Sequence, residues 1–196
     1  MIVILEGING VGKTTYARAL SSALHAPTYR AFRDDLKNEH LGQDGERERL
    51  LKKYDVGHNT HRDDLYAADL LGRLDVDVIM DRSLPSAIAY DRLEGRPQLP
   101  HDCEELLNFW QEMFGVPQKV LYIWLVAPYE MAKERALSRP DQFWPLNHHK
   151  YTELHATFAS IYWQLKMRKF AIDTSKLTPD EGVEGILGAC RQHLSK

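Results

Sequence analysis

Residues 5–15 read LEGINGVGKTT, and this stretch decides the fold. From Gly7 to Thr14 it fits the pattern GxxxxGK followed by Ser or Thr without a mismatch. Glycines let the backbone adopt positive φ and come close to phosphate oxygens, while the N–H groups of the loop and of the next helix point at the anion. An apolar run precedes the stretch and a helical pattern follows it, which is the context that the motif requires. We therefore predict a phosphate-binding loop rather than an ordinary glycine-rich turn.

The residue types of this loop indicate ATP and Mg²⁺ as its ligands. Lys13 is expected to neutralise the β- and γ-phosphates, and the Thr14 hydroxyl to coordinate Mg²⁺. The residues predicted to contact the nucleotide are Gly7, Asn9, Gly10, Val11, Gly12, Lys13, Thr14 and Thr15.

Length and composition favour one soluble domain. The chain has 196 residues, 43% of them hydrophobic and 27% charged, with a net charge of -3. This mild charge gives no support to a surface that wraps nucleic acid. Cys103 and Cys190 have no metal-ligand spacing, and the apolar start is too short for a signal peptide or a membrane span. We expect a cytoplasmic protein with two reduced thiols and no membrane partner.

Apolar runs alternate with helical patterns along the whole chain, which is typical of a parallel sheet with crossover helices. The predicted strands are 2–5, 28–32, 76–80, 119–126 and 170–172. The predicted helices are 13–24, 60–74, 85–93, 101–114, 128–138, 148–167 and 178–194. The fold class is therefore α/β, a three-layer arrangement of a five-stranded parallel sheet with helices on both faces, in a single domain over 1–196. Residues 37–58 are polar and fit mixed helix and loop.

Asp81 and Arg82 end the third predicted strand, where ligands bind in such sheets. Asp81 should face the phosphate loop, as a second Mg²⁺ ligand and catalytic carboxylate. Arg82 can neutralise an acceptor phosphate or the transferring group. The alternative is a helix N-cap followed by a surface charge.

The sequence resembles the thymidylate kinase branch of the nucleotide and deoxynucleoside kinases. Residues 5–15 are similar to the EGxDGxGKTT motif of that family, and residues 81–90 are similar to its DRYxxSxxAY. Residues 172–175 look like the loop near adenine, and residues 120–126 like the fourth strand. The resemblance implies a P-loop kinase domain, often a homodimer, with an arginine-bearing lid, here around 135–147. Arg135 and Arg139, four apart on one helix face, would then relieve transition-state charge; the alternative is a solvated basic face.

The chain departs from the family where the acceptor binds. The family carries a Phe that stacks on the base and, four positions later, an Arg that grips the monophosphate, whereas the matching positions here are Leu65 and Asp69. Asn9 replaces the loop Asp of the family. Asp69 would repel a monophosphate unless a nearby Arg30, Arg62 or Arg73 compensates. The predicted substrate-binding residues are Tyr66, Asp69, Arg82, Ser86 and Tyr90, with the two tyrosines open to a second interpretation as core aromatics.

These observations favour ATP-dependent phosphoryl transfer to a deoxynucleoside monophosphate. One alternative is a kinase for a hydroxyl group on a deoxynucleoside or on a hydroxymethylated base (5-hydroxymethyluracil type) in phage DNA, in which case DNA is a partner. An alternative of another class is a P-loop ATPase or GTPase switch. The chain has no NKxD motif, and its third strand ends in Asp-Arg rather than Asp-Glu, both of which disfavour a switch.

Overall fold

A five-stranded parallel sheet forms the centre of the protein. The computed structural model describes residues 1–30, 59–73, 76–95, 103–115, 119–139 and 144–194. The strand order is β2-β3-β1-β4-β5, and every neighbouring pair is parallel. The strands are β1 (Ile2–Glu6), β2 (Thr28–Arg30), β3 (Val78–Asp81), β4 (Val120–Val126) and β5 (Arg168–Asp173). The predicted α/β class is confirmed.

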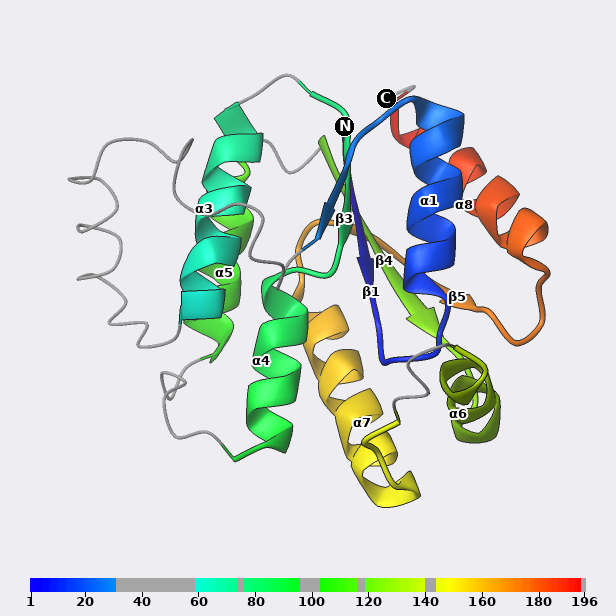
Figure 1. The fold of residues 1–196 in the computed structure, drawn as a ribbon. Helices are drawn as coiled ribbons and strands as arrows, with labels where there is room; N and C mark the ends of the chain where they lie inside the picture. The colour runs from blue at the N-terminus through cyan, green and yellow to red at the C-terminus, as the bar shows by residue number, and fades with distance from the viewer. Residues whose placement is uncertain (31–58, 74–75, 96–102, 116–118, 140–143, 195–196) are drawn as a thin grey trace.

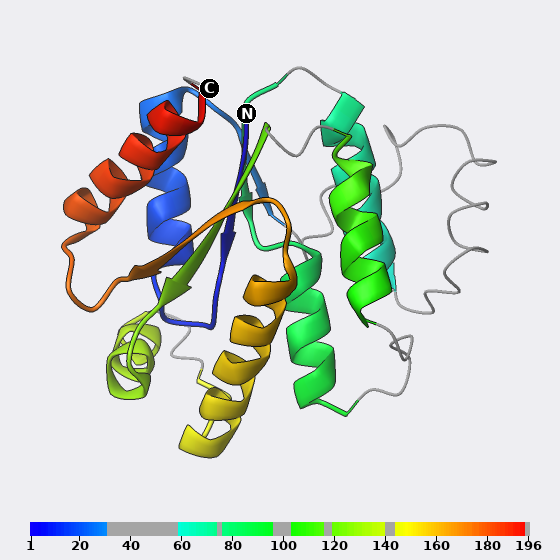
Figure 2. The same cartoon turned by 180° about the vertical axis from the view of Figure 1, so that it is seen from behind.

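Helices cover both faces of the sheet. In Figures 1 and 2, α1 and α8 lie on one face, and α3, α4, α5 and α7 lie on the other, while α6 lies beside the carboxyl ends of the strands. The bounds are α1 (Lys13–Leu24), α3 (Asn59–Arg73), α4 (Leu84–Leu93), α5 (Cys103–Met113), α6 (Tyr129–Leu137), α7 (His148–Gln164) and α8 (Pro179–Leu194). This is the three-layer arrangement that the alternating pattern predicted.

The central strands are buried on both faces because helices pack on each side. All residues of β1 and β3 are buried, and so are all but the last of β4. Such strands read as continuous apolar runs, which is why they could be located from the sequence. The edge strand β5 is largely exposed and begins with Arg168 and Lys169, so only its apolar centre was predicted.

The predicted element boundaries agree with the structure to within a few residues. Strand β3 begins at Val78 and includes Asp81, and helix α7 stops at Gln164 because Leu165 is extended. Residues 37–58 and part of the predicted lid, 140–143, lie outside the described residues. Within the described part of the chain, no helix is long and apolar enough to cross a membrane.

Candidate functional site

The loop between β1 and α1 can be made only with glycine at three positions. Gly7, Gly10 and Gly12 have φ of 140°, 85° and 95°. A Cβ on Gly7 would lie 2.4 Å from the Leu125 carbonyl oxygen, and one on Gly10 would lie 2.0 Å from that of Ala132. The loop is therefore pressed against the end of β4 and against α6. This packing holds its backbone in the conformation that the motif predicted.

Lys13 turns back into the loop. Its ammonium nitrogen donates to the carbonyl oxygens of Gly7, at 2.8 Å, and Ile8, at 2.6 Å. The side chain is buried, and this burial, followed by the charge of Arg82, lowers the pKa of Lys13 well below its ordinary value. Its hydrogen-bond acceptors within the described part of the chain are two neutral carbonyls, and a desolvated cation in such surroundings gains from an added anion. The geometry suits a phosphate ligand.

Thr14 and Asp81, the two predicted metal ligands, meet in the structure. The Thr14 hydroxyl donates to the Asp81 carboxylate at 2.9 Å. Asp81 pairs in register with Leu5 of the neighbouring β1, which brings its buried carboxylate to the start of α1. Hydroxyl and carboxylate oxygens are the hard donors that Mg²⁺ prefers, so these two residues fit that ion. Among the described residues, no group of three or more His, Cys, Asp or Glu side chains forms another candidate metal site.

Arg82 lies across the phosphate loop. Its guanidinium donates to the Gly7 carbonyl oxygen at 3.4 Å, to the Ser86 hydroxyl at 3.0 Å and to the side-chain oxygen of Asn9. The backbone of Arg82 has a φ of 79°, a left-handed conformation that a residue with a Cβ adopts at a cost of about 1 kcal/mol. Strain of this kind is often found at functional sites. Arg82 thus joins the end of β3 to the loop after β1.

Glu6 is a site residue that the sequence reasoning missed. It ends β1, its side chain is fully buried, and its carboxylate oxygens accept hydrogen bonds from Ser83, at 2.7 Å, and from Ser86. Burial raises the pKa of Glu6, and the two serines, Arg82 and Lys13 oppose that rise. The available signal was a charged residue closing an otherwise apolar strand. Ser83 is the N-cap of α4, yet its hydroxyl makes no cap bond because it points to Glu6.

Arg135 and Arg139, predicted to act together, have different surroundings. Arg135 donates to the hydroxyl and to the carbonyl oxygen of Thr174, both at 3.0 Å. Thr174 in turn donates from its backbone N–H to the Val126 carbonyl oxygen at 2.8 Å. Arg135 therefore ties α6 to the turn after β5. Arg139 is exposed, and its charge contributes to the lowered pKa of Lys13. A role for either arginine in the transition state stays a prediction.

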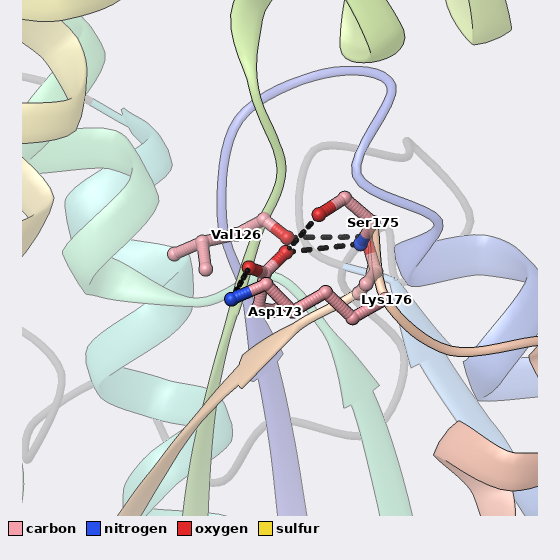
Figure 3. Close-up of polar contacts among 5 residues, drawn as sticks. Val126, Asp173, Ser175 and Lys176 are labelled. Atoms are coloured by element: carbon pink, nitrogen blue, oxygen red, sulfur yellow. Dashed lines mark hydrogen bonds and ion pairs between the residues drawn. The ribbon is translucent and has the colours of Figure 1, made fainter.

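The turn after β5 is ordered by its own side chains. The Asp173 carboxylate accepts from the backbone N–H of Ser175 at 3.0 Å and from its hydroxyl at 2.6 Å, and forms an ion pair with Lys176 at 3.4 Å. Figure 3 shows these residues beside Val126, the last residue of β4. The Ser175 hydroxyl bond is the main reason that the pKa of Asp173 is lowered. From the sequence, residues 172–175 resemble the loop near adenine, and in the structure this turn lies at the carboxyl edge of the sheet.

Two predicted substrate residues have clear partners in the protein. The Arg82 guanidinium lies 5.2 Å from the centre of the Tyr90 ring, which also meets Phe158 edge to face. The Tyr90 hydroxyl is buried with no hydrogen-bond partner among the described residues. On α3, Asp69 accepts two bonds from Arg73, at 3.0 and 2.9 Å. Arg73, one of the arginines expected to compensate for the Asp69 charge, is thus paired with it, and a substrate contact for Asp69 stays a prediction.

The other predicted contacts differ in exposure. Ser86 is fully buried, with its hydroxyl between Glu6 and Arg82, and a substrate contact for it stays a prediction. Val11 is buried in the core and offers the nucleotide only its backbone, whereas Thr15 is exposed. The side chain of Tyr66 lies outside the described residues.

The site defines a P-loop protein of the kinase type, because it combines the glycine loop, the buried lysine and the Thr14–Asp81 pair on a parallel sheet. A family model described as thymidylate kinase matches residues 5–182. The chain belongs to the thymidylate kinase family.

Several relatives and solved structures are similar to the chain. The thymidylate kinase of Xanthomonas oryzae pv. oryzae (strain PXO99A) is 31% identical over 150 residues, which are 69% of this chain and 61% of that protein. A probable thymidylate kinase of Thermoplasma volcanium is 34% identical over 96 residues, 46% of this chain and 47% of that one. The match thus spans less than two thirds of the length of these relatives.

Among solved structures, the YorR protein of Bacillus subtilis in complex with phosphorylated GDP has a TM-score of 0.66 and 19% identity, covering 100% of this chain and 99% of that one. Deoxyadenosine kinase from M. mycoides with bound dATP has a TM-score of 0.62 and 17% identity, covering 97% of this chain and 100% of that one. At these identities the likeness concerns the fold.

Proposed function

We propose that the protein transfers the terminal phosphoryl group of ATP, as its Mg²⁺ complex, to a nucleoside monophosphate of the thymidylate type. The observation that carries this proposal is the meeting of Lys13, the Thr14–Asp81 pair and Arg82 within one network at the carboxyl ends of β1 and β3. Phosphoryl transfer needs positioning and charge stabilisation more than covalent chemistry, and these groups supply both.

The residues have separate roles in this proposal. The backbone of Gly7–Thr14 and Lys13 hold the triphosphate, while Thr14 and Asp81 hold Mg²⁺, which would neutralise charge on the phosphate oxygens. Arg82 stands beside the loop, and among the described residues its guanidinium donates to the neutral oxygens of Gly7, Ser86 and Asn9, the last in the place where the family carries an Asp. Its positive charge is therefore available for the acceptor phosphate or for the phosphoryl group in transfer.

The acceptor distinguishes two forms of the proposal. The Asp69–Arg73 pair supports a monophosphate, because it neutralises the carboxylate that would repel one. The missing phosphate arginine at position 69 favours instead a hydroxyl acceptor, on a deoxynucleoside or on a hydroxymethylated base in DNA. We favour the monophosphate, since Arg82 remains to bind it.

A screen of ADP release tests both forms. The protein is mixed with ATP and Mg²⁺ and then with each deoxynucleoside monophosphate, each deoxynucleoside, or DNA that contains hydroxymethyluracil. We expect turnover with at least one monophosphate, dTMP first, and a turnover roughly 10²–10³-fold lower in a Lys13→Met variant. Turnover with only the hydroxyl acceptors would move the assignment to the second form. Equal hydrolysis with and without every acceptor would support an ATPase switch and refute the kinase.

A further inference from the structure

Glu6 is a buried carboxylate that the proposed reaction does not use directly. It lies at the end of β1, next to Gly7, and its side chain has no exposed surface. Burial of a carboxylate costs free energy unless hydrogen bonds compensate for the lost water. Both oxygens receive such bonds, and both donors, Ser83 and Ser86, belong to the start of α4 directly after Arg82. The placement suggests that Glu6 organises the segment that carries Arg82.

Ser86 is the link between Glu6 and Arg82. Its hydroxyl donates its one proton to the Glu6 carboxylate and accepts a hydrogen bond from the Arg82 guanidinium at 3.0 Å. A hydroxyl has a single proton, so once Ser86 donates that proton to Glu6, its oxygen lone pairs can only accept from another donor. The carboxylate of Glu6 therefore sets Ser86 as an acceptor toward Arg82. The second arm of the guanidinium is then free to reach Asn9 of the phosphate loop.

We propose that Glu6 is a positioning residue for Arg82, acting through the Ser86 hydroxyl to hold the guanidinium across the phosphate loop. The inference rests on the proposed function, in which Arg82 meets phosphate. Among the described residues, Lys13 and Arg82 are cations that face Glu6, and Glu6 in turn helps to raise the pKa of the buried Tyr122 hydroxyl on β4. Held in this way, Arg82 loses little conformational freedom when phosphate arrives, which is the advantage of a preorganised site.

A Glu6→Gln variant separates positioning from nucleotide binding. The amide keeps the size of the side chain but has no negative charge and only one acceptor oxygen, so it cannot accept the protons of both Ser83 and Ser86. We expect kcat to fall by roughly tenfold or more, as for a displaced transition-state donor, with the KM for ATP changed less than twofold because the loop is intact. Ser83→Ala is the matched control, since it removes a hydroxyl from the same carboxylate but not one of the hydrogen-bond acceptors of the Arg82 guanidinium. Its kcat should stay within about threefold of wild type. A Glu6→Gln variant with wild-type kcat, or equal losses in both variants, would overturn the proposal.

A double-mutant cycle tests whether Glu6 acts through Arg82. If it does, adding Glu6→Gln to Arg82→Ala should change kcat less than twofold, whereas independent actions would multiply the two losses and refute the relay. Should Glu6→Gln fail to fold, Ser86→Ala enters the same cycle with the same expectation.

A readout independent of turnover keeps this inference distinct from the proposed function. In ¹⁵N spectra of arginine side chains, the Arg82 signal is assigned by its loss in Arg82→Ala. We expect it to be sharp in wild type, to broaden or shift in Glu6→Gln and Ser86→Ala, and to stay in place in Ser83→Ala. An unchanged signal in both of the first two variants would refute the positioning role even if the enzyme is active. An inactive wild type with the expected spectra would refute only the kinase.

Discussion

Replacing Lys13 by Met should separate activity from stability. Met has a similar length and no charge, so the side chain still fills its buried site. The variant loses two charge-assisted hydrogen bonds to the Gly7 and Ile8 carbonyls, worth about 1.5–3 kcal/mol each. It also removes a desolvated ammonium whose burial costs several kcal/mol, as its lowered pKa indicates. These contributions oppose each other, and we expect the free energy of unfolding to stay within about 1 kcal/mol of wild type.

In the turnover of Lys13→Met, no gain offsets the lost charge. Removing one charge-stabilising donor from a transition state costs about 3 kcal/mol, which corresponds to roughly 10²–10³-fold in turnover. Urea unfolding followed by circular dichroism gives the stability, and coupled ADP release gives the turnover. Lys166→Met is the matched control, because Lys166 is exposed beside the amino end of β5, at the opposite edge of the sheet from the site. Turnover of Lys13→Met within tenfold of wild type, or a loss of more than about 2 kcal/mol in stability, would refute this reasoning.

Four further results are expected. The free energy of unfolding in urea should be about 1 kcal/mol higher for Arg82→Gly than for Arg82→Ala, because glycine relieves the φ of 79° while both variants lose the guanidinium. Equal unfolding free energies would exclude strain at this residue. Asp81→Asn should raise the Mg²⁺ concentration for half-maximal turnover by roughly tenfold or more, and an unchanged Mg²⁺ titration would remove Asp81 from the metal site. Bound phosphate should raise the lowered pKa of Lys13. Affinity for an ATP analogue should therefore be full below the pKa that Lys13 has in the free protein, and should fall as the pH rises through that value. Calorimetry at increasing pH checks this, and Lys13→Met should lack the decrease. In a Cys103→Ser background, Cys190, with a pKa raised by burial to about 11, should react with a thiol reagent at pH 8 only after unfolding; fast labelling of the folded protein would contradict its burial.

Much of the fold and part of the site follow from the sequence for a simple reason. Buried parallel strands appear as continuous apolar runs, and their carboxyl ends meet at one edge. Lys13, Thr14, Asp81 and Arg82 each end or follow such a strand, so their meeting could be predicted without coordinates. The edge strand β5 was only partly visible, since its exposed positions carry polar residues.

The missing parts of the site depend on contacts between distant residues. Glu6 reaches Ser83 and Ser86, which are 77 and 80 positions away, and no local pattern specifies that pairing. Arg135 meets Thr174 across 39 positions. The spacing of Arg135 and Arg139 predicted that they share one helix face, and this prediction was wrong, because α6 ends at Leu137 and Arg139 lies in the turn beyond it. A helical period cannot show where the helix stops.

A crystal structure with Mg²⁺ and a non-hydrolysable ATP analogue would test the central claim most directly. The triphosphate should lie in the loop of Gly7–Thr14, and the ammonium of Lys13 should have left the Gly7 and Ile8 carbonyls for the β- and γ-phosphate oxygens. Nucleotide bound elsewhere, or Lys13 still bonded to those two carbonyls beside a bound triphosphate, would contradict the account.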